Sequence, residues 1–384
     1  MTRLGDVCVI SAGQGAPQGD NNYCDCEQGI PFIKAGDLSN LLSGKPENEL
    51  QCVNDEVAKN HKLKLYPSGS ILFAKSGMSC MKEYVYRTQH PCYVVSHLAI
   101  VIPEKVDGEY LRFYFQYHKP NFLIKDSAYP SISLQDISNI ELQLPSKEEQ
   151  EAVATNLNKI SELVLLRKHQ LLKLDELVKS RFIEMFGDPI DNNKGLPVKK
   201  LKEITTLITN GNTPKGGSEN YVKSGILFLR SQNVWRNRIE LDDVAYIDEA
   251  THRSLKKSSL KHKDILITKT GRINTENSSL GRAALYLGEN NSANINGHVY
   301  LVRLDGSVVP EYAVAILTSE AYRKYIRKVC VGGIDKRQIN LDQVEDFPII
   351  LPDYDKQIEF VSFVKQVDKS KYHGEITYGL EVAA

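Results

Sequence analysis

The sequence predicts an α+β fold, a mixed α/β chain with two duplicated globular domains and two long, coiled-coil-like helices. Three observations predict it. Short motifs of one half return in the same order in the other half. Two stretches poor in Gly and Pro have the length and spacing of long helices. Apolar residues make up 41% of the 384 positions and charged residues 25%, as in ordinary globular proteins.

The first expected domain covers residues 1–145. Its stretch 70–77 (SILFAKSG) holds a short apolar run between Gly and polar residues, which predicts a buried strand. Residues 109–118 are predicted to form a helix. The pair Ser133-Leu134, the pair Leu144-Pro145 and the pair Glu149-Gln150 close this copy of the repeat.

A long helix and a linker are expected over residues 146–195. Residues 146–186 contain no Gly or Pro, and 41 residues of helix reach roughly 60 Å at 1.5 Å per residue. Alternate steps of four and three residues predict one apolar seam along this helix. The seam includes Val153, Leu157, Ile160, Val164, Leu171, Leu174 and Val178.

The second expected domain covers residues 196–351 and repeats the first. Stretch 264–271 (DILITKTG) matches 70–77, and 225–230 (GILFLR) matches 29–34 (GIPFIK). A helix is expected over 311–329. The remaining matches, at offsets rising from 197 to 207, are Thr213-Pro214-Lys215-Gly216, His298, Asn340-Leu341, Leu351-Pro352 and Gln357.

A second, shorter helix is expected in residues 352–384. The seam positions Phe360, Val364 and Val367 are apolar, and the periodicity then fades near His373. The two helices are expected to pair antiparallel about a pseudo-two-fold axis, because one small domain could not cover so long a seam. The counterpart of Phe186 falls beyond residue 384, so the second helix is expected to be about half as long.

The cysteine pattern indicates the cellular compartment in which the protein is expected. Seven Cys residues without a Cys-x-x-Cys pair favour a reducing cytoplasm over a disulfide framework. No apolar run reaches the roughly 18 residues of a membrane span, and the first residues lack the apolar stretch of a signal peptide. We therefore expect a cytoplasmic protein with no membrane contact.

The charge is balanced overall but uneven along the chain. Basic and acidic residues number 48 each, yet residues 1–145 hold 13 basic and 16 acidic residues, whereas residues 196–350 hold 23 and 17. A phosphate polymer would be attracted to the second domain, although a solvated face of lysines gives the same pattern.

Catalytic motifs are missing from the sequence. It has no phosphate-binding Gly-x-x-x-x-Gly-Lys-Ser/Thr loop, no complete dinucleotide fingerprint and no Asn-Pro-Pro-aromatic element. Asp353, Asp355 and Lys356 are similar to part of a metal-nuclease site, but acids also suit the first turn of a helix. His97 and His298 are paired by the repeat, and each is expected to be partly buried.

The duplicated order, with Leu-Pro-x-x-x-x-Gln before each long helix, resembles the specificity subunits (HsdS) of type I restriction-modification systems. The resemblance covers the chain up to about residue 371. It implies that each domain is a target recognition domain for one half of a split DNA sequence. It also implies that the helices act as the spacer and dock methyltransferase subunits, which are expected to number two. S-adenosylmethionine, ATP and Mg²⁺ would then be bound by those partners and by a restriction and translocation subunit, and this chain would hold no cofactor or metal and would not be an enzyme.

Side chains that can contact base edges or phosphates give the candidate interface. In the first domain these are Lys34, Lys75, Ser76, Tyr129 and Ser131. In the second they are Lys215, Arg230, Gln232, Asn233, Arg236, Arg238, Lys269, Arg272, Lys336, Arg337 and Gln338. Lys75 and Lys269 are expected to hold phosphate, and Arg236, Arg272, Arg337 and Gln338 to contact bases.

Two other functions stay open on the residues alone. One is a self-contained DNA-processing enzyme that uses Asp353 and Asp355. The other is a protein-interaction scaffold with duplicated domains and no role in nucleic-acid binding.

Overall fold

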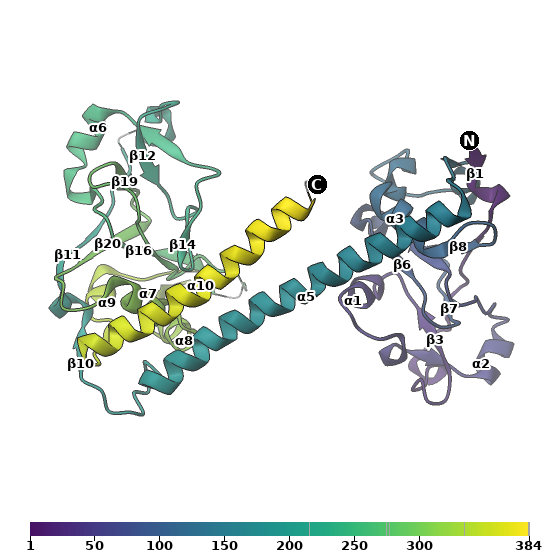
Figure 1. Cartoon of the computed structure of the whole chain (residues 1–384), viewed down its shortest axis with the longest axis horizontal. Helices are drawn as coiled ribbons and strands as arrows, with labels where there is room; N and C mark the ends of the chain where they lie inside the picture. The colour runs from purple at the N-terminus through teal and green to yellow at the C-terminus, as the bar shows by residue number, and fades with distance from the viewer. Residues whose placement is uncertain (215, 274, 276, 334, 383–384) are drawn as a thin grey trace. The chain divides into compact units, whose positions relative to one another are not determined.

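Residues 1–214, 216–273, 275, 277–333 and 335–382 are described by the computed structural model, with side chains as far as Lys371 (Figure 1). The chain divides into a first unit, Met1–Arg167, and a second unit, Lys168–Ala384. The helix α5 (Lys147–Phe186) is continuous across this division, as the Gly- and Pro-free stretch predicts. The finer boundaries expected at residues 145, 195 and 351 stay predictions.

The first unit contains short strands and short helices before α5. Its strands are β1 (Thr2–Arg3), β2 (Cys8–Ala12), β3 (Ile30–Ile33), β4 (Cys52–Val53), β5 (Ile71–Ala74), β6 (Val85–Arg87), β7 (Tyr93–Val94), β8 (Leu98–Pro103) and β9 (Glu141–Leu142). Its other helices are α1 (Leu38–Leu42), α2 (Asp55–Asn60), α3 (Gly108–Tyr117) and α4 (Leu134–Ser138). The prediction of a helix over 109–118 is confirmed by α3.

The second unit is built from more strands. They are β10 (Val198–Lys200), β11 (Thr205–Asn210), β12 (Ile226–Leu229), β13 (Val234–Trp235), β14 (Arg238–Ile239), β15 (Ala245–Ile247), β16 (Ile265–Thr268), β17 (Thr270–Arg272), β18 (Ala283–Leu285), β19 (Ala293–Ile295), β20 (Val299–Leu304), β21 (Val331–Gly332), β22 (Lys336–Gln338) and β23 (Pro348–Ile350). Its helices are α6 (Glu249–Ser254), α7 (Pro310–Thr318), α8 (Glu320–Val329), α9 (Leu341–Glu345) and α10 (Tyr354–Val382).

The sheets of the two units have matching strand orders. The order β2-β8-β5-β6 of the first unit corresponds to β11-β20-β16-β18 of the second. The three-stranded order β4-β3-β7 corresponds to β15-β12-β19, and in each sheet the last pair is parallel while the other is antiparallel. The pairs β1-β9 and β10-β23 correspond as well. The internal repeat of the sequence is therefore a repeat of topology.

The repeated apolar runs form an inner strand of each four-stranded sheet. All four residues of β5 are buried, and so are all four of β16. Alternate side chains point to opposite faces of a strand, so each face packs into a different apolar cluster. Ile71 and Phe73 join the cluster of α3, whereas Leu72 joins the cluster around Tyr66. The sheet is therefore the middle layer of the unit.

The expected single helix over 311–329 is wrong in one respect, because the chain forms two helices there. Ser319 is extended (φ −64°, ψ 155°) and separates α7 from α8. Its hydroxyl accepts a hydrogen bond from the Tyr322 backbone N–H at 3.2 Å, which caps α8. A serine followed by an acid is a helix-start signal, and here it outweighs the continuous apolar spacing.

The second long helix extends further than its periodicity predicts. α10 has 29 residues and runs to Val382, beyond the expected end near His373. Within the second unit its first turns lie antiparallel to the last turns of α5 (Figure 1). Lys371 pairs with Asp175 at 2.8 Å, whereas Arg181 pairs with Glu359 at 2.9 Å, so numbers rise along one helix as they fall along the other. The antiparallel pairing is confirmed here.

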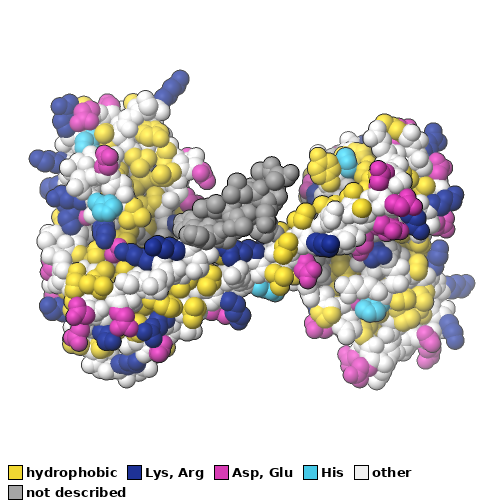
Figure 2. Space-filling view, in the orientation of Figure 1, with side chains coloured by type: hydrophobic (Ala, Val, Ile, Leu, Met, Phe, Trp, Pro, Cys, Tyr) yellow, Lys and Arg dark blue, Asp and Glu magenta, His cyan; other side chains and the backbone are white. Residues whose placement is uncertain are grey.

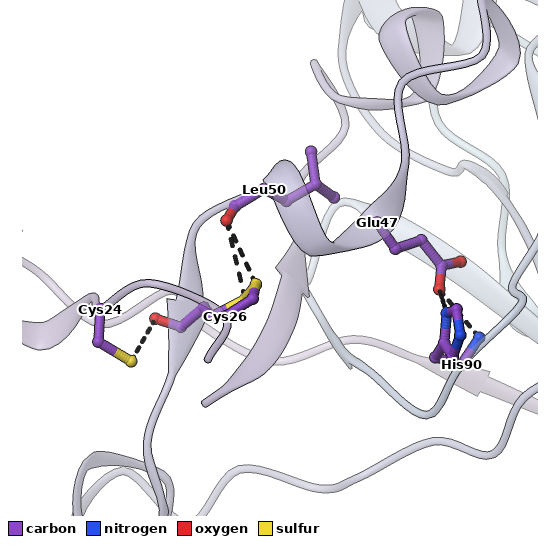
Figure 3. The surroundings of a disulfide bond; sticks show 6 residues. Cys24, Cys26, Glu47, Leu50 and His90 are labelled. Atoms are coloured by element: carbon purple, nitrogen blue, oxygen red, sulfur yellow. Dashed lines mark hydrogen bonds and ion pairs between the residues drawn. A yellow bond between two sulfur atoms is a disulfide. The ribbon is translucent and has the colours of Figure 1, made fainter. Parts of the chain in front are cut away.

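One pair of cysteines departs from the expectation of a chain without disulfides. Cys26 is bonded to Cys52 at the start of β4, and Cys24 lies beside them (Figure 3). Cys24 and the other four cysteines are free thiols. Burial raises the pKa of the Cys8 thiol to about 12 and that of Cys92 to about 12, so both stay protonated at neutral pH.

A buried carboxylate organises the same side of the first unit. Glu47 is 2% exposed and accepts hydrogen bonds from Tyr86 Oη, from the backbone N–H groups of Gln89 and His90, and from His90 Nδ1 (Figure 3). Four donors satisfy a carboxylate that burial would otherwise destabilise.

Among the helices of the described residues, none combines the length and the apolar character that a membrane span requires.

Candidate nucleic-acid interface

Four candidate residues of the second domain come together on one β-ribbon, formed by β17 and β22. Its register places Arg272 opposite Lys336, Gly271 opposite Arg337 and Thr270 opposite Gln338. Arg272, Lys336 and Gln338 are exposed. Two segments 64 residues apart therefore place Arg272 beside Lys336, with Arg337 next in sequence. The other edge of β22 pairs with β21, so this ribbon belongs to a three-stranded sheet.

The first unit has a smaller counterpart at the equivalent position. Ser76 and Ser131 form an isolated bridge, and these residues correspond to Thr270 and Gln338 in the repeat. Tyr129, two residues before Ser131, is 82% exposed. The predicted cluster of Lys75, Ser76, Tyr129 and Ser131 therefore exists as one surface, with fewer charges than the ribbon of the second unit.

The two repeated lysines occupy the same backbone position. The N–H of Lys75 donates to the His97 carbonyl at 2.9 Å, and its carbonyl accepts from Ile132 at 2.8 Å. Lys269 repeats this geometry with His298 at 2.8 Å and Ile339 at 3.0 Å. The Lys269 ammonium lies 5.7 Å from the centroid of the Tyr300 ring, where a cation is attracted to the π face. Each lysine follows an inner strand and precedes the residue that begins the ribbon or bridge.

The two repeated histidines are exposed, so the expectation that they are partly buried is wrong. His97 Nδ1 lies 2.8 Å from Ser76 Oγ, and His298 follows Asn296, whose side chain accepts from its N–H. Each histidine stands in the turn before an inner strand, beside the repeated lysine. The sequence did not indicate that these histidines are exposed, because the apolar run that follows each one favours burial.

The segment that begins at Arg230 folds back on itself. Asn233 is 2% exposed, and its amide donates to the carbonyls of Glu240 and Asp243. The prediction that Asn233 is a DNA-binding residue therefore does not fit the structure, because its side chain is buried and bonded within its own segment. Arg230 and Gln232 both donate to the Asp243 carboxylate, so this acid offsets the charge of Arg230 and holds both side chains in place.

The hairpin of β13 and β14 carries the next candidates. Arg238 pairs with Glu240 at 2.7 Å and lies over the Trp235 ring at 5.2 Å. Arg236 is exposed at the turn, and partial desolvation followed by the charge of Arg323 lowers the pKa of its guanidinium. A cation that is held near other cations attracts anions. Arg236 is therefore the hairpin residue that fits a phosphate best.

Sequence reasoning missed two groups of cations beside this hairpin. Arg282 is 7% exposed, and its guanidinium stacks on Trp235 at 3.8 Å. The helix α8 carries Arg323, Lys324, Arg327 and Lys328 around its buried Tyr322 and Ile326. The signal in the sequence is the spacing of four residues between Arg323 and Arg327 and between Lys324 and Lys328, which places these cations on neighbouring turns of one helix.

The hairpin, α8 and the ends of the two long helices line a cleft of about 1690 Å³ within the second unit. Its walls include Arg236, Arg238, Lys324 and Lys328, together with apolar side chains of α5 and α10. Figure 2 shows that Lys and Arg side chains stand among hydrophobic patches on the visible face of this unit.

Two candidates lie elsewhere. Lys34 follows β3, donates to Gln51 Oε1 at 2.6 Å and lies 4.3 Å from the centroid of the Tyr23 ring, so it is tied to its own unit. Lys215 lies outside the described residues.

The predicted helix seam is covered unevenly. In the second unit Phe360 is 1% exposed, Val367 is buried, and Val178 and Val364 pack against the core. Leu157, Val164, Leu171 and Leu174 are half-buried, while Val153 and Ile160 are exposed. Other exposed apolar residues on α5 are Leu163, Leu165, Leu166, Leu172, Leu177 and Ile183.

Asp353 and Asp355 lie at the start of α10, where the Asp353 carbonyl accepts from the N–H groups of Lys356 and Gln357. In the described part of the chain, no group of three or more His, Cys, Asp or Glu side chains is arranged to hold a metal ion.

Known protein sequences include relatives of this chain. The family model for the type I restriction modification DNA specificity domain matches residues 1–176. The chain is 25% identical over 263 residues to the MjaIX type I restriction enzyme specificity subunit of Methanocaldococcus jannaschii, which is 63% of this chain and 60% of that protein. It is 23% identical over 172 residues to the putative MjaX specificity subunit of the same organism, 44% of this chain and 39% of that protein. The chain thus spans less than two thirds of either relative.

Solved structures share the fold over the whole chain. The S subunit of a type I restriction-modification system from M. genitalium aligns with a TM-score of 0.54 at 13% identity, covering 100% of this chain and 92% of that one. A chain from a structural study of assembly and conformational transition in a type I system aligns with a TM-score of 0.55 at 15% identity, covering 100% and 93%. The chain is thus similar in sequence to specificity subunits of type I restriction-modification systems, and it shares the fold of the solved ones.

Proposed function

We propose that this chain is the non-catalytic DNA specificity subunit of a type I restriction-modification complex, in which each unit reads one half of a bipartite target. The observation that carries the proposal is the repeated surface after the inner strand: the β17–β22 ribbon in the second unit and the Ser76–Ser131 bridge in the first. Two equivalent reading surfaces on one chain suit a target with two halves.

The two surfaces differ in charge, which suggests a division of work. The ribbon offers Arg272, Lys336 and Arg337, and bidentate Arg contacts to guanine are the commonest specific contacts to DNA. The bridge offers Tyr129 and two serines beside Lys75, so it would depend more on hydroxyl contacts and shape. Arg236 and the cations of α8 would hold the phosphate backbone near the ribbon.

The long helices would set the gap between the half-sites and dock partners. Exposed apolar residues on α5, among them Leu163, Leu166 and Leu172, offer a surface that methyltransferase subunits would cover. S-adenosylmethionine, ATP and Mg²⁺ would be bound by the methyltransferase and restriction subunits.

The test is to map methylated adenines in host DNA and then to exchange one domain. The intact chain should direct methylation to a two-part motif with a fixed gap. Replacing residues 196–351 by the corresponding domain of another specificity subunit should change one half of the motif and leave the other half unchanged. A change in both halves would contradict the assignment of one unit to each half.

Retention on duplex DNA separates the other functions. Phosphate contacts predict an affinity that falls steeply as salt is raised, whereas a pure protein scaffold would show no such retention. A self-contained nuclease would cleave DNA alone and lose that activity in the Asp353→Ala, Asp355→Ala double variant.

A further inference from the structure

A buried glutamine occupies the fourth position of each long helix. Gln150 in α5 is 4% exposed, and Gln357 in α10 is 2% exposed. They are the last residue of the repeated Leu-Pro-x-x-x-x-Gln motif. A polar side chain buried in the first turn of an otherwise solvated helix needs a local reason.

Both glutamines make the same two hydrogen bonds. Gln150 Oε1 accepts from the Asp107 backbone N–H at 2.9 Å, and its Nε2 donates to the Pro145 carbonyl at 2.9 Å. Gln357 Oε1 accepts from the Val309 N–H at 3.0 Å, and its Nε2 donates to the Pro352 carbonyl at 3.0 Å. Asp107 and Val309 are the N-cap residues of α3 and α7.

Each glutamine amide therefore joins three segments: the long helix, the chain that follows strand β9 or β23, and the domain helix α3 or α7. We call this arrangement the glutamine joint. Its two bonds run in different directions from one planar amide, so they restrict rotation of the long helix about its first turn as well as its tilt. An apolar replacement would leave a buried N–H and a buried carbonyl unsatisfied, which is costly.

Small changes of angle at this joint have large effects at a distance. A helix of 40 residues is about 60 Å long, so a tilt of about 5° at its root moves the far end by about 5 Å. One base pair of B-DNA advances about 3.4 Å along the axis and also rotates the next groove position.

We propose that Gln150 and Gln357 are positioning residues that set the gap between the two half-sites, by fixing the angle at which each long helix leaves its domain. This inference rests on the proposed function, because it presumes that the two units read a target with a fixed gap. We expect the stronger effect from Gln150, because the position of α5 that corresponds to the buried Phe360 of α10 is Val153, which is 40% exposed. Close to the joint, Ala154 is buried and Asn158 Oδ1 accepts a hydrogen bond from Arg112 Nη2 at 2.8 Å.

The experiment maps methylated sites in a host that carries the whole system with the variant chains Gln150→Leu, Gln150→Glu and Gln357→Leu. Gln150→Glu keeps the volume and the acceptor but replaces the donor to Pro145 with a carboxylate oxygen. Gln135→Leu is the matched control, because Gln135 is exposed on α4 and bonds only to Asn139. The readout is the fraction of sites methylated when the gap is the preferred one, and one base pair longer or shorter.

The expected result is a relaxed gap with both half-sites unchanged. Methylation at sites one base pair from the preferred gap should rise at least ~10-fold in Gln150→Leu and Gln150→Glu, and less in Gln357→Leu. Hydrogen exchange at the Asp107 amide should quicken in Gln150→Leu, which lacks the acceptor for this amide, while the amides of β5 and β8 stay protected, which shows that the joint has opened in a folded unit.

Three results would overturn the proposal. In the first, the gap preference of all three variants equals that of the parent chain. In the second, methylation falls in equal proportion at every gap, or both Gln150 variants lose protection throughout the first unit, so that the glutamine is only structural. In the third, the parent chain itself tolerates any gap, which also removes the proposed function; the first two results leave that function intact.

Discussion

The two long helices begin with the same glutamine joint but are supported by very different apolar contacts. In the second unit Phe360 of α10 packs with Phe182 and Phe186 of α5 and with Tyr312 of α7, at ring centroid distances of 5.4 to 6.5 Å. In the first unit the position equivalent to Phe360 is Val153, which is 40% exposed. We therefore expect the loss of the polar joint to matter less in the second unit than in the first.

A second difference lies at the start of the inner strand. Asp264, just before β16, is 2% exposed and binds Arg303 through two bonds of 2.8 and 2.7 Å. The equivalent residues of the first unit are Ser70 and Ile102, and the Ser70 hydroxyl donates to the Pro67 carbonyl at 2.6 Å. The topology is therefore maintained by a buried ion pair in one copy and by a single neutral hydrogen bond in the other, so the fold itself requires neither solution.

The comparison of the joints predicts the largest effect for Phe360→Ala. Removing a buried aromatic ring from this cluster should lower the free energy of unfolding of the second unit by ~3–5 kcal/mol. Val153→Ala, at the equivalent position of the first unit, should change the free energy by no more than ~0.5 kcal/mol. Urea unfolding followed by near-ultraviolet circular dichroism measures both. Equal losses in the two variants would mean that the aromatic cluster adds nothing to the joint.

The ion pair gives the next effect in size. Asp264→Ala leaves the Arg303 guanidinium without its carboxylate, and since Arg303 is 22% exposed we expect a loss of ~2–3 kcal/mol. Ser70→Ala removes one neutral hydrogen bond and should cost ~1 kcal/mol. The same unfolding measurement tests the pair. A double variant, Asp264→Ala with Arg303→Met, should recover part of the loss; a further loss would show that Arg303 has another role.

Much of this architecture could be predicted from the sequence, for physical reasons that concern local pattern. The apolar runs at 71–73 and 265–267, the Gly- and Pro-free stretch and the order of the motifs all depend on short-range spacing, and the fold follows them. The break at Ser319 also has a local signal, a serine followed by Glu320, but the apolar spacing on either side of it favours one continuous helix.

The candidate site was harder to predict, because burial of polar residues depends on contacts far apart in sequence. Asn233 and Arg236 belong to the same polar segment, yet one is buried against Glu240 and Asp243 while the other is exposed. The Cys26–Cys52 bond joins residues 26 apart, and no spacing rule for cysteine points to it. Arg282 acquires its place from Trp235, which lies 47 residues earlier. The repeat does place Lys75 and Lys269 at the same backbone position in both copies.

The smallest effect concerns a carboxylate at the joint of the second unit. Glu311, in the first turn of α7, lies 2.9 Å from the Lys263 ammonium and 3.9 Å from that of Lys365 on α10. Burial alone raises the pKa of Glu311, but the hydrogen bond from Lys263, the backbone N–H and the two lysine charges together hold that pKa below its ordinary value. The equivalent acid of the first unit, Glu109, pairs with Arg87 and Arg112 instead.

A carboxyl group with a lowered pKa in the folded state stabilises the protein above its unfolded-state pKa, and this stability is lost as the pH falls through the folded-state value. Glu311→Gln should therefore lower the free energy of unfolding by ~0.5–1 kcal/mol at pH 7, and the difference from the parent chain should shrink between about pH 5 and about pH 3. Urea titrations across this range measure it, with Glu249→Gln, an exposed acid in the first turn of α6, as the control. A difference that stays constant with pH would show that Glu311 acts through packing and not through its charge.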